Sequence, residues 1–428
     1  MKKIGIVICN YNKKQYVLDC IQSVLESRFQ DFDLYVVDNG SQDGSGKAIR
    51  ETYPEQVTLI CNQENLGGSG GFNTGLRIVH EKGYPYLMCV DNDVLMDENA
   101  IGNLYQFLEE HPEAGMAGAK VYHMEAPDYV QQFGQKIDFE YFCTEVNYYN
   151  AYEDGSMPEY LFTDSEAACA LMVRRSIVDR IGIMPEENFL YWDDTEWCYR
   201  CNQAGYKVAS VGNAVVLHAM GAKKEAVNTF PTYYAWRNWI RFFIKYTPES
   251  EWDRMAENFL GSVFQEVYEG LHKGDHHKVE TIMLAYDDAI HNITGKAGEN
   301  RIFPLDFRSE PWERLFRETK TICINRKEYP ETAERICRIA SELGYQIEWI
   351  DSDAQNLFAE KEICICDSIF RVDDLERKRV YVDVNDCILQ TEDDVLDVIN
   401  YNYSKRSFIY GQKPLFLQKI REMRKIPE

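Results

Sequence analysis

Long apolar runs are missing from the sequence: no stretch approaches the roughly 20 apolar residues that a membrane-spanning helix needs. Lys2 and Lys3, followed by the apolar residues 4–9, resemble the start of a signal peptide, but this run is too short for the hydrophobic region of one. We therefore expect a cytoplasmic protein, either soluble or peripherally attached at the inner face of the membrane.

Basic charge is scarce as well. The chain has 46 Lys and Arg residues against 70 Asp and Glu residues, which gives a net charge of -24. Binding a polyanion requires a basic surface, so this balance argues against nucleic acid as a partner. A small anionic ligand would have to be held locally, by a bound cation or by backbone amides.

A disulfide framework is also absent. The 13 cysteines are odd in number and scattered without a regular spacing, which is typical of reduced thiols in a cytosol. Cys198 and Cys201 have the spacing of a zinc-ligand pair, but no second pair accompanies them. We therefore expect no structural zinc.

The first part of the chain alternates β-rich runs with helical patterns, as in a mostly parallel α/β sheet. Ligands of such sheets bind at the carboxyl ends of the strands, and polar residues follow each predicted strand here. Strands are predicted at residues 4–9, 34–38, 57–61 and 86–90, and helices at residues 16–25, 46–53, 71–82 and 99–111.

The chain length of 428 residues suggests two or three domains at roughly 100–200 residues each. We predict an α/β catalytic domain at residues 1–245, a helical extension at residues 246–318 and a small α/β domain at residues 319–428. Strands of the last domain are predicted at residues 321–324, 346–350, 362–366 and 379–384. Homo-oligomerisation is left open.

The motif Asp91-Asn92-Asp93 directly follows the apolar strand at residues 86–90. Two carboxylates one residue apart at a strand end can bind a hard cation such as Mg²⁺ or Mn²⁺. Such a cation could bridge diphosphate oxygens and stabilise a leaving group. The alternative is a polar turn without a ligand, because an isolated Asp-x-Asp pair is common.

Four glycines lie between Asn65 and Asn73, at Gly67, Gly68, Gly70 and Gly71. Next to a helix start, they would let the backbone approach a ligand and expose amides to an anion. The run lacks the Gly-Lys-Ser/Thr of a Walker loop and the spacing of a dinucleotide fingerprint. A flexible loop is the alternative.

An acidic and aromatic cluster, Trp192-Asp193-Asp194-Thr195-Glu196-Trp197, lies at the predicted start of a helix at residues 192–204. Acidic residues there can simply cap the helix. Two adjacent carboxylates flanked by Trp192 and Trp197 also suit a general base beside a sugar-stacking surface. His218, after the predicted strand at residues 206–217, could be a third metal ligand, although a single histidine is more often structural.

Together these motifs resemble those of family 2 glycosyltransferases of the GT-A fold, a nucleotide-diphospho-sugar transferase fold with a Rossmann-like mixed sheet. The resemblance covers about residues 1–245. Three motifs are most similar to the galactofuranosyltransferase and rhamnosyltransferase branches: the glycine run with Phe72, Trp192-Asp193-Asp194, and Tyr233-Tyr234-x-x-Arg237-Asn238.

The resemblance implies an inverting, metal-dependent hexosyltransferase that builds cell-surface polysaccharide. Asp194 would be the catalytic base, with Asp193 orienting the acceptor hydroxyl, and Trp192 and Trp197 would contact the acceptor. Asp91, Asp93 and His218 would hold Mn²⁺ or Mg²⁺. The donor would be contacted by Asn10, Asn12, Asp38, Asn65, Gly67, Gly68, Asn73, Asp91 and Arg237, with Tyr233 as a further candidate.

The glycine run favours UDP-galactofuranose as the donor and a glycan or lipid-linked glycan as the acceptor. A dTDP-rhamnose transferase is the alternative. Two other classes are a sugar nucleotidyltransferase, which should carry glycine in the loop after its first strand, and a non-catalytic glycan-binding protein, which would be expected to lose its carboxylates.

The C-terminal segment, residues 412–425, has apolar residues opposite basic ones. A basic amphipathic tail could contact anionic lipid headgroups. The alternative is a terminal helix packed on its own domain.

Overall fold

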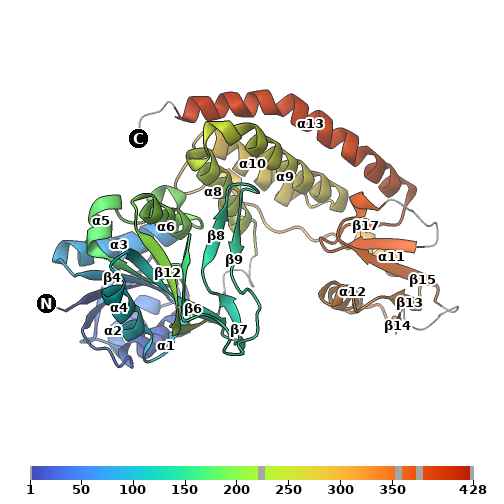
Figure 1. Cartoon of the computed structure of the whole chain (residues 1–428). Helices are drawn as coiled ribbons and strands as arrows, with labels where there is room; N and C mark the ends of the chain where they lie inside the picture. The colour runs from blue at the N-terminus through green and yellow to red at the C-terminus, as the bar shows by residue number, and fades with distance from the viewer. Residues whose placement is uncertain (1, 220–226, 352–358, 373–378, 425–428) are drawn as a thin grey trace. The chain divides into compact units, whose positions relative to one another are not determined.

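A computed structural model describes residues 2–219, 227–351, 359–372 and 379–424 (Figure 1). The chain forms two compact units. The first comprises Met1–Ala226, Tyr234–Thr247 and Asn292–Glu299, and the second Val227–Tyr233, Pro248–His291 and Asn300–Glu428. The second unit therefore contains most of the predicted helical extension and the C-terminal α/β region, and the division into three domains stays a prediction.

A mixed sheet forms the centre of the first unit, in the order β10-β12-β6-β11-β4-β1-β2-β3. One half is parallel, as predicted: β1 pairs with β2 and β4, and β2 pairs with β3. These strands are β1 (Ile4–Asn10), β2 (Phe32–Asp38), β3 (Val57–Cys61) and β4 (Tyr86–Asp91).

The other half of the sheet is mixed. β11 (Ala170–Arg174) runs antiparallel to both β4 and β6 (Ala114–His123), and β6 runs parallel to β12 (Lys207–His218). The remaining strands are β5 (Val94–Met96) and β10 (Tyr160–Thr163), paired with β12, β7 (Ala126–Gln132), paired with β6, and a separate hairpin of β8 (Gln135–Asp138) and β9 (Cys143–Val146).

Helices cover both faces of this sheet, because alternate residues of each buried strand point to opposite sides. In β1, Ile6 and Ile8 pack in the cluster formed with α1, α2 and α4, whereas Val7 packs in the cluster with α3, α5 and α6. These helices are α1 (Lys14–Leu25), α2 (Ser45–Thr52), α3 (Gly67–Lys82), α4 (Ala100–Glu110), α5 (Arg175–Ile181) and α6 (Asp193–Gln203).

Helix α3 begins four residues earlier than the predicted start at residue 71 and includes the glycine run. The glycines permit close packing on β1: a Cβ at Gly71 would lie 2.4 Å from Cys9 Sγ, and one at Gly75 would lie 2.4 Å from Val7 Cγ1. Packing against the sheet thus outweighs the poor helix propensity of glycine.

The second unit has a five-stranded sheet in the order β14-β13-β15-β16-β17. Its strands are β13 (Thr321–Ile324), β14 (Glu348–Asp351), β15 (Lys361–Cys366), β16 (Arg379–Asp383) and β17 (Ile388–Leu389). The helices that follow the first unit's sheet are α8 (Phe230–Tyr246), α9 (Trp252–Lys273), α10 (His276–Ile290), α11 (Glu310–Phe316), α12 (Pro330–Glu342) and α13 (Glu392–Arg424), with short 3₁₀ turns at Glu186–Asn188, Glu249–Glu251, Glu299–Arg301 and Ile369–Arg371.

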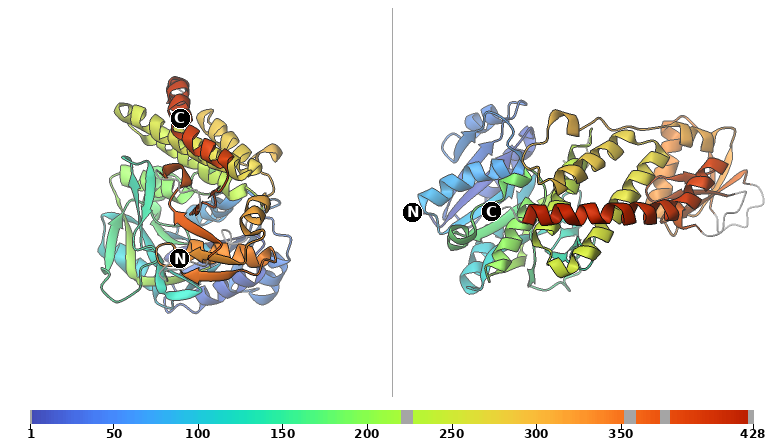
Figure 2. Two further views of the ribbon diagram at one scale, coloured as in Figure 1. Left: turned by 90° about the vertical axis from the view of Figure 1, so that its right-hand side faces the viewer. Right: turned by 90° about the horizontal axis from the view of Figure 1, so that it is seen from above.

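The predicted C-terminal tail is the last part of α13, a single long helix that lies along α9 (Figure 2). Phe416 and Ile420 are fully buried, and the Phe416 ring lies 6.3 Å from that of Phe259 and 6.1 Å from that of Tyr286. Phe416 and Ile420 of the tail therefore pack within their own unit, whereas Leu415 is exposed, and membrane contact stays a prediction. Among the residues described, no helix is both long and apolar enough to cross a membrane.

Candidate active site

Three of the predicted donor-site residues meet at the carboxyl ends of β1, β2 and β4. Asn10 is the register partner of Asp38, and its neighbour Cys9 is the partner of Asp91. The Asn10 side chain approaches Asp38 Oδ1 at 3.4 Å and accepts a hydrogen bond of 2.8 Å from Asn92. The strand ends thus form one polar edge, as the sequence predicts.

Asn12 lies on the loop after β1, in the left-handed region with φ 51°. Its backbone N–H donates to Ser41 Oγ at 3.0 Å, and its side-chain oxygen accepts from the N–H of Gln42 at 2.8 Å. These bonds fix the loop after β2 beside the loop after β1. Contact of Asn12 with a nucleotide stays a prediction.

Asn39, which the sequence analysis did not single out, organises the glycine run. It donates to Asn65 Oδ1 at 3.1 Å and to the Gly67 carbonyl at 2.9 Å. Its own oxygen accepts from Asn62 at 2.9 Å and from the Leu66 N–H at 3.2 Å. Its position directly after the end of β2 is the sequence signal that could have identified it.

The glycine run contacts the loop that precedes the acidic cluster. Gly67 has φ +80°, and a Cβ there would lie 2.1 Å from the Phe189 carbonyl oxygen. A Cβ at Gly68 would lie 3.7 Å from Asp193 Oδ2. Glycine is therefore required for the close approach at Gly67, and the start of α3 faces an aspartate of the cluster.

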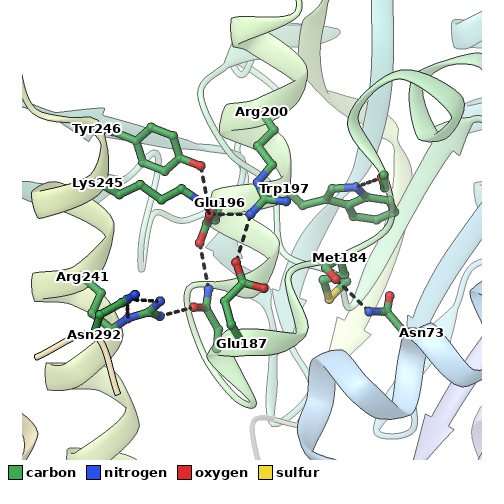
Figure 3. A network of polar contacts seen from close by, with 12 residues as sticks. Asn73, Met184, Glu187, Glu196, Trp197, Arg200, Arg241, Lys245, Tyr246 and Asn292 are labelled. Carbon is green, nitrogen blue, oxygen red and sulfur yellow. Dashed lines mark hydrogen bonds and ion pairs between the residues drawn. The ribbon is translucent and has the colours of Figure 1, made fainter. Parts of the chain in front are cut away.

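Asn73 does not line this approach. It is fully buried within α3, and its amide donates to the Met184 carbonyl at 2.7 Å and to Glu186 Oε1 at 3.0 Å (Figure 3). The prediction of a donor contact for Asn73 is therefore wrong: its side chain fastens the segment after α5 to the helix.

Asp91, Asp93 and His218 form a candidate metal site. One ligand atom from each residue lies within 4.8 Å of the others. His218 Nε2 lies 3.2 Å from Asp93 Oδ1 and 3.9 Å from Asp91 Oδ2. β12 brings His218 there because its end pairs with β5, which follows the Asp-x-Asp motif.

Gln131 and Lys13 complete this site, and sequence reasoning missed both. Gln131 Oε1 lies 2.7 Å from His218 Nδ1, while its amide group reaches the His218 carbonyl at 3.3 Å. An amide oxygen at Nδ1 accepts the proton of that nitrogen, so Nε2 is the atom that His218 would offer to a metal ion. The Lys13 ammonium pairs with Asp93 Oδ2 at 2.6 Å.

The two carboxyls of the motif have opposite pKa shifts. Burial raises the pKa of Asp91 to about 6, although the charges of His218 and Lys13 oppose this. Burial acts in the same direction on Asp93, but hydrogen bonds and charges from His218 and Lys13 outweigh it and hold its pKa well below the usual range. Two acidic oxygens and one imidazole nitrogen are a donor set that fits Mn²⁺ or Mg²⁺.

Asp193 and Asp194 begin α6, next to the glycine run. Asp194 Oδ1 accepts from the Thr195 N–H at 2.7 Å, and Oδ2 accepts from the Ala168 N–H at 3.2 Å. Burial raises the pKa of both carboxyls, and the charge of Asp194 contributes to raising that of Asp193 to about 8. Asp91 also raises the pKa of Asp193, so the pair and the metal triad share one acidic site.

Residues 5–182 match the family model described as Glycosyl transferase family 2. The chain carries a family 2 glycosyltransferase domain. Its central mixed sheet, with helices on both faces and an Asp-x-Asp motif at the end of β4, is the GT-A fold.

Three bacterial proteins are similar to part of this chain. The teichoic acid poly(glycerol phosphate) polymerase of Staphylococcus epidermidis is 29% identical over 44% of this chain and 24% of its own length. A dTDP-rhamnosyl transferase of Shigella flexneri is 25% identical over 51% of this chain and 70% of its own. A galactofuranosyltransferase of Mycobacterium tuberculosis is 22% identical over 42% of this chain and 30% of its own.

The loop that leads into Asp193 is strained. Phe189, Tyr191 and Trp192 all have positive φ, between 62° and 64°, which non-glycine residues rarely adopt. Asn238 of α8 donates to the carbonyls of Asn188 and Leu190, each at 2.8 Å, and to that of Tyr191 at 3.1 Å. These bonds hold the strained loop in place.

Arg237 has the same kind of role. It is fully buried, and its guanidinium donates to the Asn188 carbonyl at 2.9 Å and to the Gly295 carbonyl at 2.8 Å. The predicted contact of Arg237 with the donor diphosphate is therefore wrong, because its donors are directed at backbone carbonyls inside the protein. Tyr233 is also buried and donates to Asp288 Oδ2 at 2.5 Å.

Glu196 is the centre of a polar network between α6 and α8 (Figure 3). It accepts from Arg200 at 2.7 Å, Tyr246 at 2.9 Å and Lys245 at 3.1 Å. Burial acts to raise its pKa, but the charges of Arg200 and Lys245 outweigh that effect and lower it. Glu196 is thus an ionised structural residue.

The two tryptophans of the cluster differ. Trp197 is fully buried in the core, and its indole N–H donates to the Gly182 carbonyl at 2.9 Å (Figure 3). A buried ring cannot stack on a sugar, so the predicted acceptor contact of Trp197 is wrong. Trp192 is half-buried, and its ring centroid lies 5.2 Å from that of Phe242. Its contact with an acceptor stays a prediction.

Proposed function

We propose that the protein transfers a hexosyl group from a nucleotide-diphosphate sugar to a hydroxyl of a growing cell-surface glycan, with inversion at the anomeric carbon. The observation that carries this proposal is the meeting of a carboxylate–imidazole triad, a glycine-lined helix start and a buried aspartate pair at one sheet edge.

Asp91, Asp93 and His218 are the residues that would hold a divalent cation. Bound there, the cation would offset the negative charge that develops on the departing diphosphate. The protein contributes the orientation: Gln131 fixes the tautomer and ring plane of His218. Lys13 adds a positive charge at the same place, which suits a polyphosphate ligand.

Asp194 is proposed as the general base. Its carboxylate would accept the proton of the acceptor hydroxyl while the hydroxyl oxygen bonds to the anomeric carbon and the bond from that carbon to the diphosphate breaks. One displacement at one centre inverts the configuration. The raised pKa of Asp194 makes it a stronger base than an exposed aspartate, and two backbone N–H groups fix its orientation.

UDP-galactofuranose is the favoured donor, with dTDP-rhamnose as the alternative. Relatives named for each sugar support both. Asn10 and Asp38, at the ends of β1 and β2, would line the nucleoside. The loop at Asn65, Gly67 and Gly68 would lie along the diphosphate.

The experiment is a transfer assay with both donors, Mn²⁺ and a set of oligosaccharide acceptors, read by NMR of the product anomeric signals. We expect transfer from one donor with the anomeric configuration inverted. Transfer with retention would contradict the role of Asp194 as a base, and nucleotide binding without any turnover would favour a non-catalytic binding protein.

A further inference from the structure

Three exposed tyrosines lie on β7 and on the segment that follows β9. Tyr129, Tyr149 and Tyr152, here called the tyrosine ledge, are exposed to 45%, 58% and 59%. Tyrosine presents a large apolar ring with a polar tip, and it is enriched at binding surfaces for that reason. Because all three rings are exposed, burial in the core does not explain why these residues are tyrosine rather than a smaller residue.

The backbone holds the ledge in one arrangement. Tyr129 and Tyr152 are antiparallel bridge partners, and their rings pack edge to face with centroids 5.6 Å apart. Asn150 donates its N–H to the Val130 carbonyl at 2.8 Å, and the Val130 N–H donates to Ala151 at 2.9 Å. A ligand would therefore meet a preorganised surface.

A chain of side-chain contacts connects the ledge with the metal triad. The Tyr149 ring packs on the His123 ring, with centroids 6.1 Å apart and an interplanar angle of 68°. His123 Nδ1 lies 3.4 Å from the Gln131 amide, whose oxygen binds His218. Tyr149 is thus linked through His123 and Gln131 to the site where the proposed transfer would occur.

Charge identifies the kind of ligand. Residues 124–160, which carry the ledge, include eight acidic residues and a single basic residue, Lys136. This charge repels phosphate-bearing polymers and anionic lipid headgroups. Uncharged sugars, in contrast, can pack their C–H faces on the rings and hydrogen-bond to the surrounding polar groups.

We propose that the tyrosine ledge is a binding site for the uncharged glycan chain that serves as acceptor. The identity of the ligand as acceptor rests on the proposed transfer, whereas glycan binding itself does not. The ledge would hold sugar units beyond the reacting one, so it would act on acceptor affinity rather than on the chemical step.

The test is affinity electrophoresis of the full-length protein in gels that contain dextran, mannan, β-galactan or rhamnan, without nucleotide or metal. We expect at least one neutral polysaccharide to retard the protein, with roughly a tenfold loss of affinity for each ring removed in Tyr149→Ala and Tyr152→Ala. Tyr149→Phe and Tyr152→Phe should keep most of the affinity, because the stacking face remains.

Tyr410→Ala is the matched control, since Tyr410 is an exposed tyrosine of α13, at 86%. It should be retarded like the wild type, and thermal melting should show that every variant is folded. The inference is overturned if no neutral polysaccharide retards the protein, or if the Tyr149→Ala, Tyr152→Ala double variant is retarded unchanged. The inference is also overturned if the wild-type protein floats with phosphatidylglycerol vesicles and the double variant does not, because the ledge would then bind anionic lipid.

Calorimetry with UDP, dTDP and Mn²⁺ separates this result from the proposed function. Nucleotide binding without ledge-dependent retardation leaves the transferase proposal intact and refutes the ledge. Ledge-dependent retardation without nucleotide binding supports a glycan site on a protein that is not a transferase.

Discussion

The side-chain oxygen of Gln131 lies 2.7 Å from Nδ1 of His218, on the side of the ring opposite the Asp91–Asp93 carboxylates. If His218 is a metal ligand, Gln131→Leu should lower Mn²⁺ affinity roughly 10–100-fold, because the ring loses the acceptor that fixes its tautomer. Gln131→Glu keeps an oxygen at that position and should retain affinity. Titration calorimetry measures the Mn²⁺ affinity of both variants. An unchanged affinity in Gln131→Leu would show that Gln131 does not orient His218 as a metal ligand.

Lys13 pairs with the same carboxylate that would bind the metal, at 2.6 Å from Asp93 Oδ2. A divalent cation must compete with this ammonium in the free protein. Lys13→Met should therefore tighten Mn²⁺ binding in the absence of nucleotide, by about tenfold. Lys14→Met is the control. Lys14 is exposed, and its backbone N–H donates a hydrogen bond to Asp43. Equal tightening in both variants would mean that only net charge matters.

The two carboxyls of the acidic pair should differ in their effect on turnover. With a pKa of about 8, Asp193 is protonated at neutral pH, and asparagine imitates that form. Asp193→Asn should therefore keep most of the turnover at pH 7. Asp194→Asn removes the proposed base and should lower kcat by about 10²–10⁴-fold with donor binding intact.

The same pair predicts the pH profile. Because burial raises the pKa of Asp194, the base is lost by protonation as pH falls through a value above the ordinary 3.8 of an aspartate. Turnover at saturating metal and donor should decline on acidification well before an exposed aspartate would be protonated. If turnover stays constant as the pH is lowered to 3.8, the base must be a group other than Asp194.

Asn238 is expected to act through the strained loop rather than by contact with substrate. Asn238→Ala removes the side-chain donor of the Leu190 and Tyr191 carbonyls, whereas the Asn188 carbonyl keeps its bond from Arg237. The substitution should cost about 2–4 kcal/mol of unfolding free energy. Asn103→Ala, which removes a single exposed bond to the Asn213 carbonyl, is the control. Urea denaturation compares them.

A positioning role of Asn238 also predicts a kinetic effect. Under mild conditions where Asn238→Ala is folded, kcat should fall while donor affinity is retained, because the loop that carries Asp193 and Asp194 is less well fixed. A variant that loses stability but keeps full kcat would show that the loop holds its shape without Asn238.

Local patterns were sufficient for the parallel half of the sheet. Apolar runs that end in Asn10, Asp38 and Asp91 predicted β1, β2 and β4, and their carboxyl ends do meet at one edge. The Asp-x-Asp motif and His218 were likewise predicted to come together. Each of these inferences needs only strand direction and ligand chemistry.

Predictions about side-chain direction fared less well. Asn73 and Arg237 were placed at the ligand by the family resemblance, and Trp197 because it flanks the acidic cluster, yet all three are buried and bonded inside the protein. Helical spacing puts Trp197 on the core side of α6 with Cys198 and Cys201, which a residue-by-residue count could have shown. Complete burial of Arg237 depends on distant carbonyls and has no local signal.

Titration calorimetry of UDP and dTDP against the protein, with Mn²⁺ present or removed by a chelator, tests the central claim most directly. A nucleotide-sugar transferase that uses Asp91, Asp93 and His218 should bind one of the two nucleotides only when the metal is present. The Asp91→Ala, Asp93→Ala double variant should lose that binding while remaining folded. Absence of binding to either nucleotide with Mn²⁺ present, or equal binding after chelation, would contradict the account.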